Sequence, residues 1–232
     1  MKKVLSIIAV MIMVTTGYYS TATAGMIGNP TATVENGKIT AGLDVDITSR
    51  DMEDSDGFEL EADSNRILLN ATYGINPLNV YLKLGMANGE VKSDDATFDG
   101  DYGFAYGVGG KATVYEIANT AKIGVGAQLL KFTTEDTIED VKVEADQLEY
   151  DIFAGASYLG LGEFIPYGGI LISIVDGEIS AEGESLDYEQ ADNFGIFLGG
   201  DYKFTNKLTG GIEARFVNET SFSFNLSYPF SL

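Results

Sequence analysis

The segment that decides the fold is the last twelve residues, 221–232, with the sequence SFSFNLSYPFSL. Polar and apolar residues alternate without interruption, and the apolar set is Phe222, Phe224, Leu226, Tyr228, Phe230 and Leu232. Successive side chains of a β-strand point to opposite faces, so this pattern predicts a strand with one apolar face. Such a strand suits a soluble sandwich, and its length also suits a membrane, which needs about 9 to 11 residues.

The other end of the chain has the features of a secretory signal peptide. Lys2 and Lys3 precede an apolar run over residues 4–14, and Ala22-Thr23-Ala24 forms a small-x-small cleavage site before Gly25. We therefore expect an exported protein in which residues 1–24 are the signal peptide and residues 25–232 form one domain.

Together these two ends resemble the small outer-membrane β-barrel proteins of Gram-negative bacteria, the superfamily of opacity-type and porin-like barrels. The resemblance implies a location in the outer membrane, with extracellular loops and two periplasmic termini. It also implies two partners, the lipopolysaccharide-bearing membrane and the barrel assembly machinery. The machinery would read the six apolar residues of segment 221–232 as its signal.

The composition excludes several classes of function. The chain has no Cys and no His, so it lacks a disulfide framework and the commonest general base and metal ligand. The 208 residues after the predicted signal carry 12 basic and 35 acidic side chains, a formal charge of −23 that does not suit nucleic-acid binding. Past the signal no run of 18 apolar residues occurs, so a membrane protein would have to be a closed barrel.

Most of the chain repeats the two-residue period of its last segment. We predict an all-β fold, a closed antiparallel up-and-down transmembrane barrel of about ten strands, with eight as the alternative. The predicted strands cover residues 38–48, 65–74, 80–91, 103–115, 121–133, 147–158, 164–175, 191–204, 208–217 and 221–232. Residues 25–37 are expected to be a periplasmic leader of little structure. Residues 170–175 are apolar nearly throughout, and we expect their isoleucines to face lipid.

The connections between these strands fall into two classes that alternate along the chain. Four short turns near residues 75–79, 116–120, 159–163 and 205–207 are nearly free of acids, whereas the four longest loops hold 23 of the 35 carboxylates. Outer-membrane barrels have short periplasmic turns and longer extracellular loops, so this sorting favours a barrel over a secreted soluble β-protein.

The predicted inward face carries nearly balanced charges. They are Asp44, Asp46, Arg66, Lys83, Lys111, Lys122, Glu149, Asp151, Asp201, Lys203, Glu213 and Arg215, with Lys38 beside them. In a barrel of this size the interior is narrow and mostly filled by side chains, which favours a network of ion pairs. The alternative is that the same charges line a thin aqueous path for ions or small solutes.

The sequence gives little evidence for a catalytic site. The carboxylate pairs Asp44 with Asp46 and Glu149 with Asp151 are about 7 Å apart on one face, but inward lysines and arginines make ion pairing the better interpretation. The outer-membrane enzyme families need a histidine, so we expect no enzyme and no cofactor.

Four loop acids, Asp54, Asp56, Asp99 and Asp101, resemble fragments of calcium loops without completing the ligand series. They are either solvated loop charge or part of an acidic rim that divalent cations bridge to lipopolysaccharide phosphates.

The sequence as a whole predicts a monomeric, non-enzymatic outer-membrane barrel with a structural or surface-interaction role. A narrow porin-like channel is the alternative, and a secreted soluble β-protein is the third choice.

Overall fold

The structure is a computed structural model that describes residues 25–54, 57–93, 97–118, 120–138, 140–205 and 207–230. The predicted signal peptide and Leu232 lie outside these residues. No helix within the described ranges is long and apolar enough to cross a membrane. The strands that the structure describes are β1 (Ile39–Asp54), β2 (Glu59–Ile75), β3 (Leu78–Lys92), β4 (Thr97–Ile117), β5 (Ala121–Ile138), β6 (Val141–Tyr158), β7 (Phe164–Ala181), β8 (Glu184–Gln190), β9 (Phe194–Lys203), β10 (Thr209–Phe216) and β11 (Thr220–Phe230).

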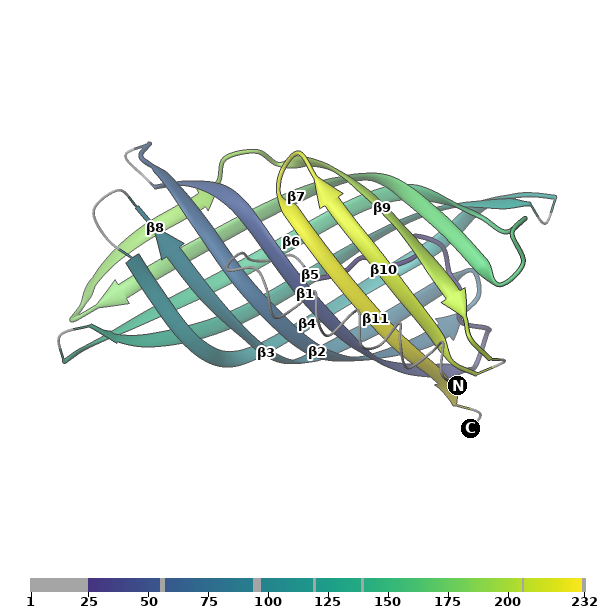
Figure 1. The fold of residues 1–232 in the computed structure, drawn as a ribbon, viewed down its shortest axis with the longest axis horizontal. Coiled ribbons are helices and arrows are strands. Elements are labelled where there is room, and N and C mark those ends of the chain that lie inside the picture. The colour runs from purple at the N-terminus through teal and green to yellow at the C-terminus, as the bar shows by residue number, and fades with distance from the viewer. Residues whose placement is uncertain are drawn as a thin grey trace, which may run out of the picture.

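The strands form one antiparallel sheet that closes on itself (Figure 1). Ten of them follow one another around the ring, and the last, β11, pairs with the first, β1, from Ile39 opposite Phe230 to Ser49 opposite Thr220. A closed ring leaves no unpaired edge, which is the condition for placing strands in hydrocarbon. The predicted ten-stranded barrel is confirmed, and β8 is an additional strand.

Strand β8 changes the barrel at one end. It folds back on β7 through Glu182 and Gly183, both with positive φ, and it also pairs with β1, where Met52 lies opposite Gln190. Figure 1 shows β8 at the end of the barrel away from the C-terminal end of β11. We call the β8 end the outer end and the opposite one the inner end. Because β8 takes the place of β9, β10 and β11 there, eight strands enclose the outer end and ten enclose the rest.

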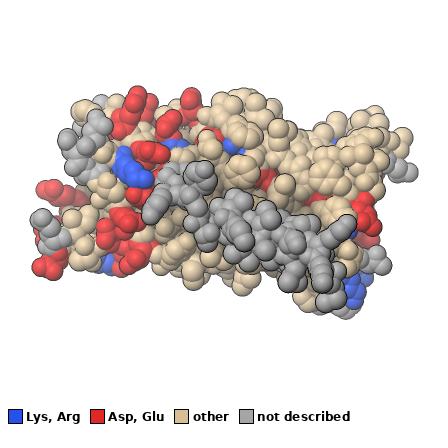
Figure 2. Space-filling model, viewed as in Figure 1, with Lys and Arg blue, Asp and Glu red and all other residues tan. Residues whose placement is uncertain are grey.

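The prediction of long acidic loops at this end is wrong. Strand β1 continues to Asp54 and β2 begins at Glu59, and the other three predicted loops are likewise mostly strand. The physical reason is that the period of two continues through these segments: acids occupy the outward positions, while small or apolar residues such as Met52 and Ala62 are buried inside. Figure 2 shows the acidic side chains gathered around this end.

The outward face of the barrel is apolar between its two ends. In β7, Ile170, Ile172 and Ile174 are 52%, 50% and 45% exposed, whereas Leu171 and Val175 between them are each 1% exposed. The predicted outward facing of the isoleucines is therefore confirmed. Exposed apolar side chains on the other strands continue this surface around the ring, and in Figure 2 it forms a band largely free of charge. A soluble protein rarely exposes a contiguous apolar surface of this extent.

A lysine within the apolar band should destabilise the barrel. We expect Ile170→Lys to lower the free energy of unfolding in lipid by about 2 to 4 kcal/mol, because it places a charge in hydrocarbon. The control is Leu186→Lys on β8, where the exposed leucine lies outside the band and the change should be about 1 kcal/mol or less. Urea unfolding in vesicles measures both, and equal effects would contradict the assignment of the band.

Candidate functional site: the barrel lumen

The outer end of the lumen is filled by apolar side chains. Strands β1 to β4 and β6 to β8 each contribute to this outer apolar cluster, which consists of Met52, Ala62, Val91, Phe98, Val143, Ala145, Val175 and Tyr188. All are less than a tenth exposed. The eight-stranded end of the barrel is therefore packed like a protein core.

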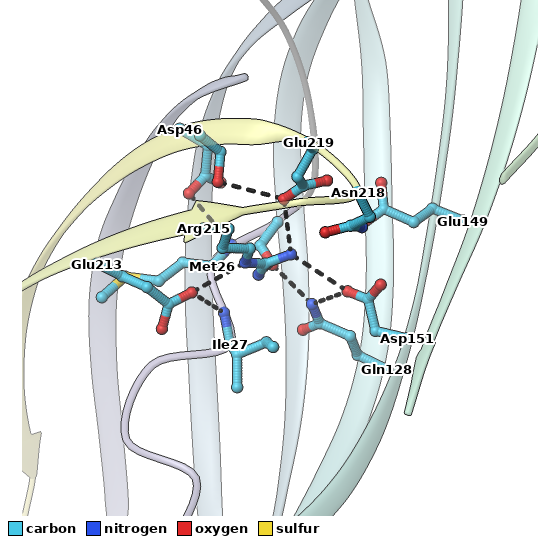
Figure 3. Close-up of polar contacts among 12 residues, drawn as sticks. Met26, Ile27, Asp46, Gln128, Glu149, Asp151, Glu213, Arg215, Asn218 and Glu219 are labelled. Atoms are coloured by element: carbon cyan, nitrogen blue, oxygen red, sulfur yellow. Dashed lines mark hydrogen bonds and ion pairs between the residues drawn. The ribbon is translucent and has the colours of Figure 1, made fainter. Parts of the chain in front are cut away.

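Below this cluster lies a buried ion network centred on Arg215 of β10 (Figure 3). Its guanidinium lies 3.1 Å from Glu213, 3.4 Å from Glu219 and 3.6 Å from Asp151, and none of these four side chains is exposed. The planar guanidinium of Arg215 presents several N–H donors whose geometry suits carboxylates. The three carboxylates share its positive charge through these donors.

Two further arginines extend this Arg215 network toward the outer end. Arg50 lies 2.7 Å from Glu219 and 3.5 Å from Glu149, and Arg66 lies 3.1 Å from the same Glu149 oxygen. The Arg66 guanidinium also lies 4.9 Å from the centre of the Phe132 ring. Buried charges are tolerated only when each one is paired and hydrogen-bonded, so the three arginines and their carboxylates form one interdependent unit.

Residues 25–34, the N-terminal segment, lie inside the barrel. The amide N–H of Met26 donates to Asp46 at 3.1 Å, and those of Ile27 and Gly28 donate to Glu213 at 3.0 and 2.9 Å. Figure 3 shows Ile27 beneath Glu213 and the Arg215 network. The expected leader of little structure is therefore wrong, because lumen carboxylates bind the backbone of this segment.

The rest of the N-terminal segment is held as closely. Asn79 accepts hydrogen bonds from the amides of Thr33 and Val34 at 2.8 and 2.9 Å and donates to the Val34 carbonyl at 2.9 Å. A Cβ added at Gly74 would lie 2.2 Å from the Glu35 carbonyl oxygen, and one at Gly124 would lie 2.2 Å from that of Pro30. These two wall positions need glycine because the backbone at Glu35 and at Pro30 approaches them directly.

The inner end of the lumen is open. A cavity of about 980 Å³ lies there, the inner vestibule, and its lining includes Lys38, Lys83, Lys111, Lys122, Lys203 and Lys207 together with Glu35, Asp44, Glu163 and Asp201. Lys83 lies 3.6 Å from Asp44, and Lys122 lies 2.7 Å from Glu116 at the rim. The vestibule ends against the N-terminal segment, which also lines it.

Comparison with known proteins identifies this architecture. No protein-family profile and no curated protein sequence matches the chain. Among solved structures, the translocator domain of the autotransporter NalP from Neisseria meningitidis is 10% identical, with a TM-score of 0.50 over 86% of this chain and 90% of that one. The transport unit of the autotransporter AIDA-I from Escherichia coli is 13% identical over 84% and 90% of the two chains, with a TM-score of 0.45. The COG4313 outer membrane channel from Pseudomonas putida F1 is 14% identical over 87% and 97%, with a TM-score of 0.42.

The chain has the fold of a closed antiparallel β-barrel, similar to that of the NalP translocator domain. At these identities the comparison shows the fold alone, and the role of this barrel depends on its lumen and its surface.

The structure brings together most of the predicted lumen charges. Eight are buried inside the barrel: Asp44, Asp46, Arg66, Lys83, Glu149, Asp151, Glu213 and Arg215. Lys111 and Asp201 are half-buried beside the N-terminal segment. Lys111 donates a hydrogen bond to the Ile27 carbonyl, and Asp201 accepts one from the side-chain amide of Asn29, at 3.4 Å each. Lys122 and Lys203 were predicted within the same network, but they lie at the open inner end, Lys122 half-buried and Lys203 exposed.

Sequence reasoning missed two members of the network, Arg50 and Glu219. Arg50 continues the inward series Asp44, Asp46 and Thr48 of β1, so the period of two could have found it if the strand had been extended. Glu219 lies between β10 and β11, where no periodic pattern applies.

The acids considered for a metal site do not gather into one. Asp54 accepts a hydrogen bond from the Phe58 amide at 2.9 Å, Asp99 and Asp101 lie on β4, and Asp56 falls outside the described residues. The described part of the chain contains no group of three or more acidic side chains placed to hold one metal ion.

Removing the central arginine should destabilise this barrel more than removing a cation at the vestibule. We expect Arg215→Met to lower the free energy of unfolding by about 3 to 5 kcal/mol, because three buried carboxylates lose their shared partner. Lys203→Met, at the exposed mouth, should cost about 1 kcal/mol or less. Urea unfolding of the refolded proteins measures both, and equal stabilities would show that the network does not hold the barrel together.

Proposed function

We propose that this protein is a non-enzymatic outer-membrane barrel with a structural or surface-interaction role and a sealed lumen. The observation that carries the proposal is the continuous filling of the lumen, by the outer apolar cluster, the Arg215 network and the N-terminal segment in turn. A pathway for solutes would have to cross all three layers.

Each layer opposes conduction for a different reason. Apart from the Tyr188 hydroxyl, the outer apolar cluster consists of apolar side chains, and an ion entering it would lose its hydration. In the Arg215 network the charged groups are paired with one another at 2.7 to 3.6 Å rather than with water. The N-terminal segment is fixed by hydrogen bonds along its length to Asp46, Glu213 and Asn79.

The absence of histidine from the sequence supports a non-enzymatic role, as does the pairing of the buried carboxylates with arginines. The surface available for interaction is the strongly acidic outer end (Figure 2). We place this end outside the cell and both termini in the periplasm. Lipopolysaccharide, bridged by divalent cations, and the barrel assembly machinery are the partners that suit this placement, with the protein acting as a monomer.

One observation favours the alternative of a narrow channel. The inner vestibule reaches from the inner mouth to the N-terminal segment, so part of the path is already open. Conduction would then require the N-terminal segment, the network and the outer cluster all to rearrange.

Electrical recording from the refolded protein separates the two functions. We expect a heat-modifiable band on electrophoresis, which reports a folded barrel, and no stepwise conductance in a planar bilayer. Phe98→Ala, which thins the outer apolar cluster, should also stay closed because the Arg215 network lies beneath it. Stepwise conductance of the unmodified protein would reject the sealed lumen and support the channel.

A further inference from the structure

The buried charges of the lumen are not balanced. Among the described residues, six buried acids face four buried bases in this space. The acids are Asp44, Asp46, Glu149, Asp151, Glu213 and Glu219, and the bases are Arg50, Arg66, Lys83 and Arg215. Half-buried Asp201 and Lys111 offset each other. An uncompensated charge inside a protein is strongly unfavourable. We therefore expect a further positive charge in the lumen.

Asp46 is one of three buried lumen carboxylates with an oxygen that has no hydrogen-bond partner among the described residues, with Glu149 and Asp151, and it binds the backbone next to Gly25. It is fully buried, and its Oδ1 accepts the Met26 amide at 3.1 Å, while its Oδ2 has no hydrogen-bond partner within the described structure. The backbone of Gly25 lies one residue away, and consecutive Cα atoms are about 3.8 Å apart. The nitrogen of Gly25 therefore lies near the same carboxylate, one residue from the amide that Asp46 binds.

Gly25 itself is enclosed. Its carbonyl accepts hydrogen bonds from Gln128, at 2.6 Å, and from Arg215. A Cβ added at Gly25 would lie 3.4 Å from Lys83 Nζ and 3.5 Å from a methyl carbon of Leu130. The Arg215 network and the outer apolar cluster fill the lumen on the outer side.

We propose that the folded protein begins at Gly25 and that the α-ammonium of Gly25 forms a buried ion pair with Asp46. Hydrolysis of the Ala24–Gly25 peptide bond by a leader peptidase consumes one water, leaving a carboxylate on Ala24 and the new amine on Gly25. This amine supplies one of the two missing positive charges and a donor for Asp46 Oδ2. Removal of the predicted signal peptide thereby creates the group that fixes the N-terminal segment in the lumen.

The test uses the protein expressed from the whole 232-residue chain and purified from outer membranes. Intact mass and the N-terminal peptide should show a chain that starts at Gly25. An amine-acylating reagent should modify this α-amine at least about tenfold more slowly in the folded barrel than in urea, because the amine is buried and paired. A different first residue, or equal rates in both states, would overturn the proposal.

Two variants on the same strand show whether Asp46 is the partner. Asp46→Asn should raise the acylation rate of the folded protein towards the unfolded rate. Asp44→Asn should change it much less, since buried Asp44 binds Asn70 and Asn225 directly and reaches the N-terminal segment only through Lys83, which donates to the Met26 carbonyl at 2.6 Å. An identical effect of both substitutions would reject the specific ion pair. If Asp46→Asn does not assemble, the comparison of folded and unfolded wild-type protein still decides whether the amine is buried. None of these readouts depends on whether the barrel conducts.

Discussion

The rest of the structure depends on one constraint: in hydrocarbon every backbone N–H and C=O must find a partner within the protein. This chain meets it by pairing β11 with β1 over eleven residues, which turns an open sheet into a ring. The register of this pairing also sets which side chains face outward. A shift of one residue would turn the apolar side chains inward.

Closing the ring creates a second requirement, because the inward positions then form a confined space that must be filled. The chain fills it in layers: an apolar cluster where eight strands enclose it, and an ion network where ten do. The N-terminal segment supplies backbone donors to Asp46 and to Glu213, which also pairs with Arg215. The interior thus resembles a polar protein core more than a pore.

Much of the fold could be predicted from the sequence, because strand alternation and the short turns depend on local pattern. Segment 221–232 predicted β11, and the isoleucines of β7 faced lipid as expected. The acidic segments were harder, since their outward acids concealed inward residues such as Met52 and Val143. The position of the N-terminal segment could not be predicted, because its contacts to Glu213 and Asn79 are long-range hydrogen bonds of the backbone that leave no periodic signal.

The closure of β1 on β11 is the central claim, and a disulfide cross-link tests it most directly in a chain that has no cysteine. Ile47 lies opposite Phe222 on the outward face, and directly paired residues are close enough for a disulfide. Ile47→Cys with Phe222→Cys should form an intramolecular cross-link in the membrane, seen as an altered mobility that reductant reverses. Ile47→Cys with Phe224→Cys, two residues out of register, should form it poorly. A cross-link that forms only between two chains, or equally in both pairs, would contradict a barrel closed by a single chain.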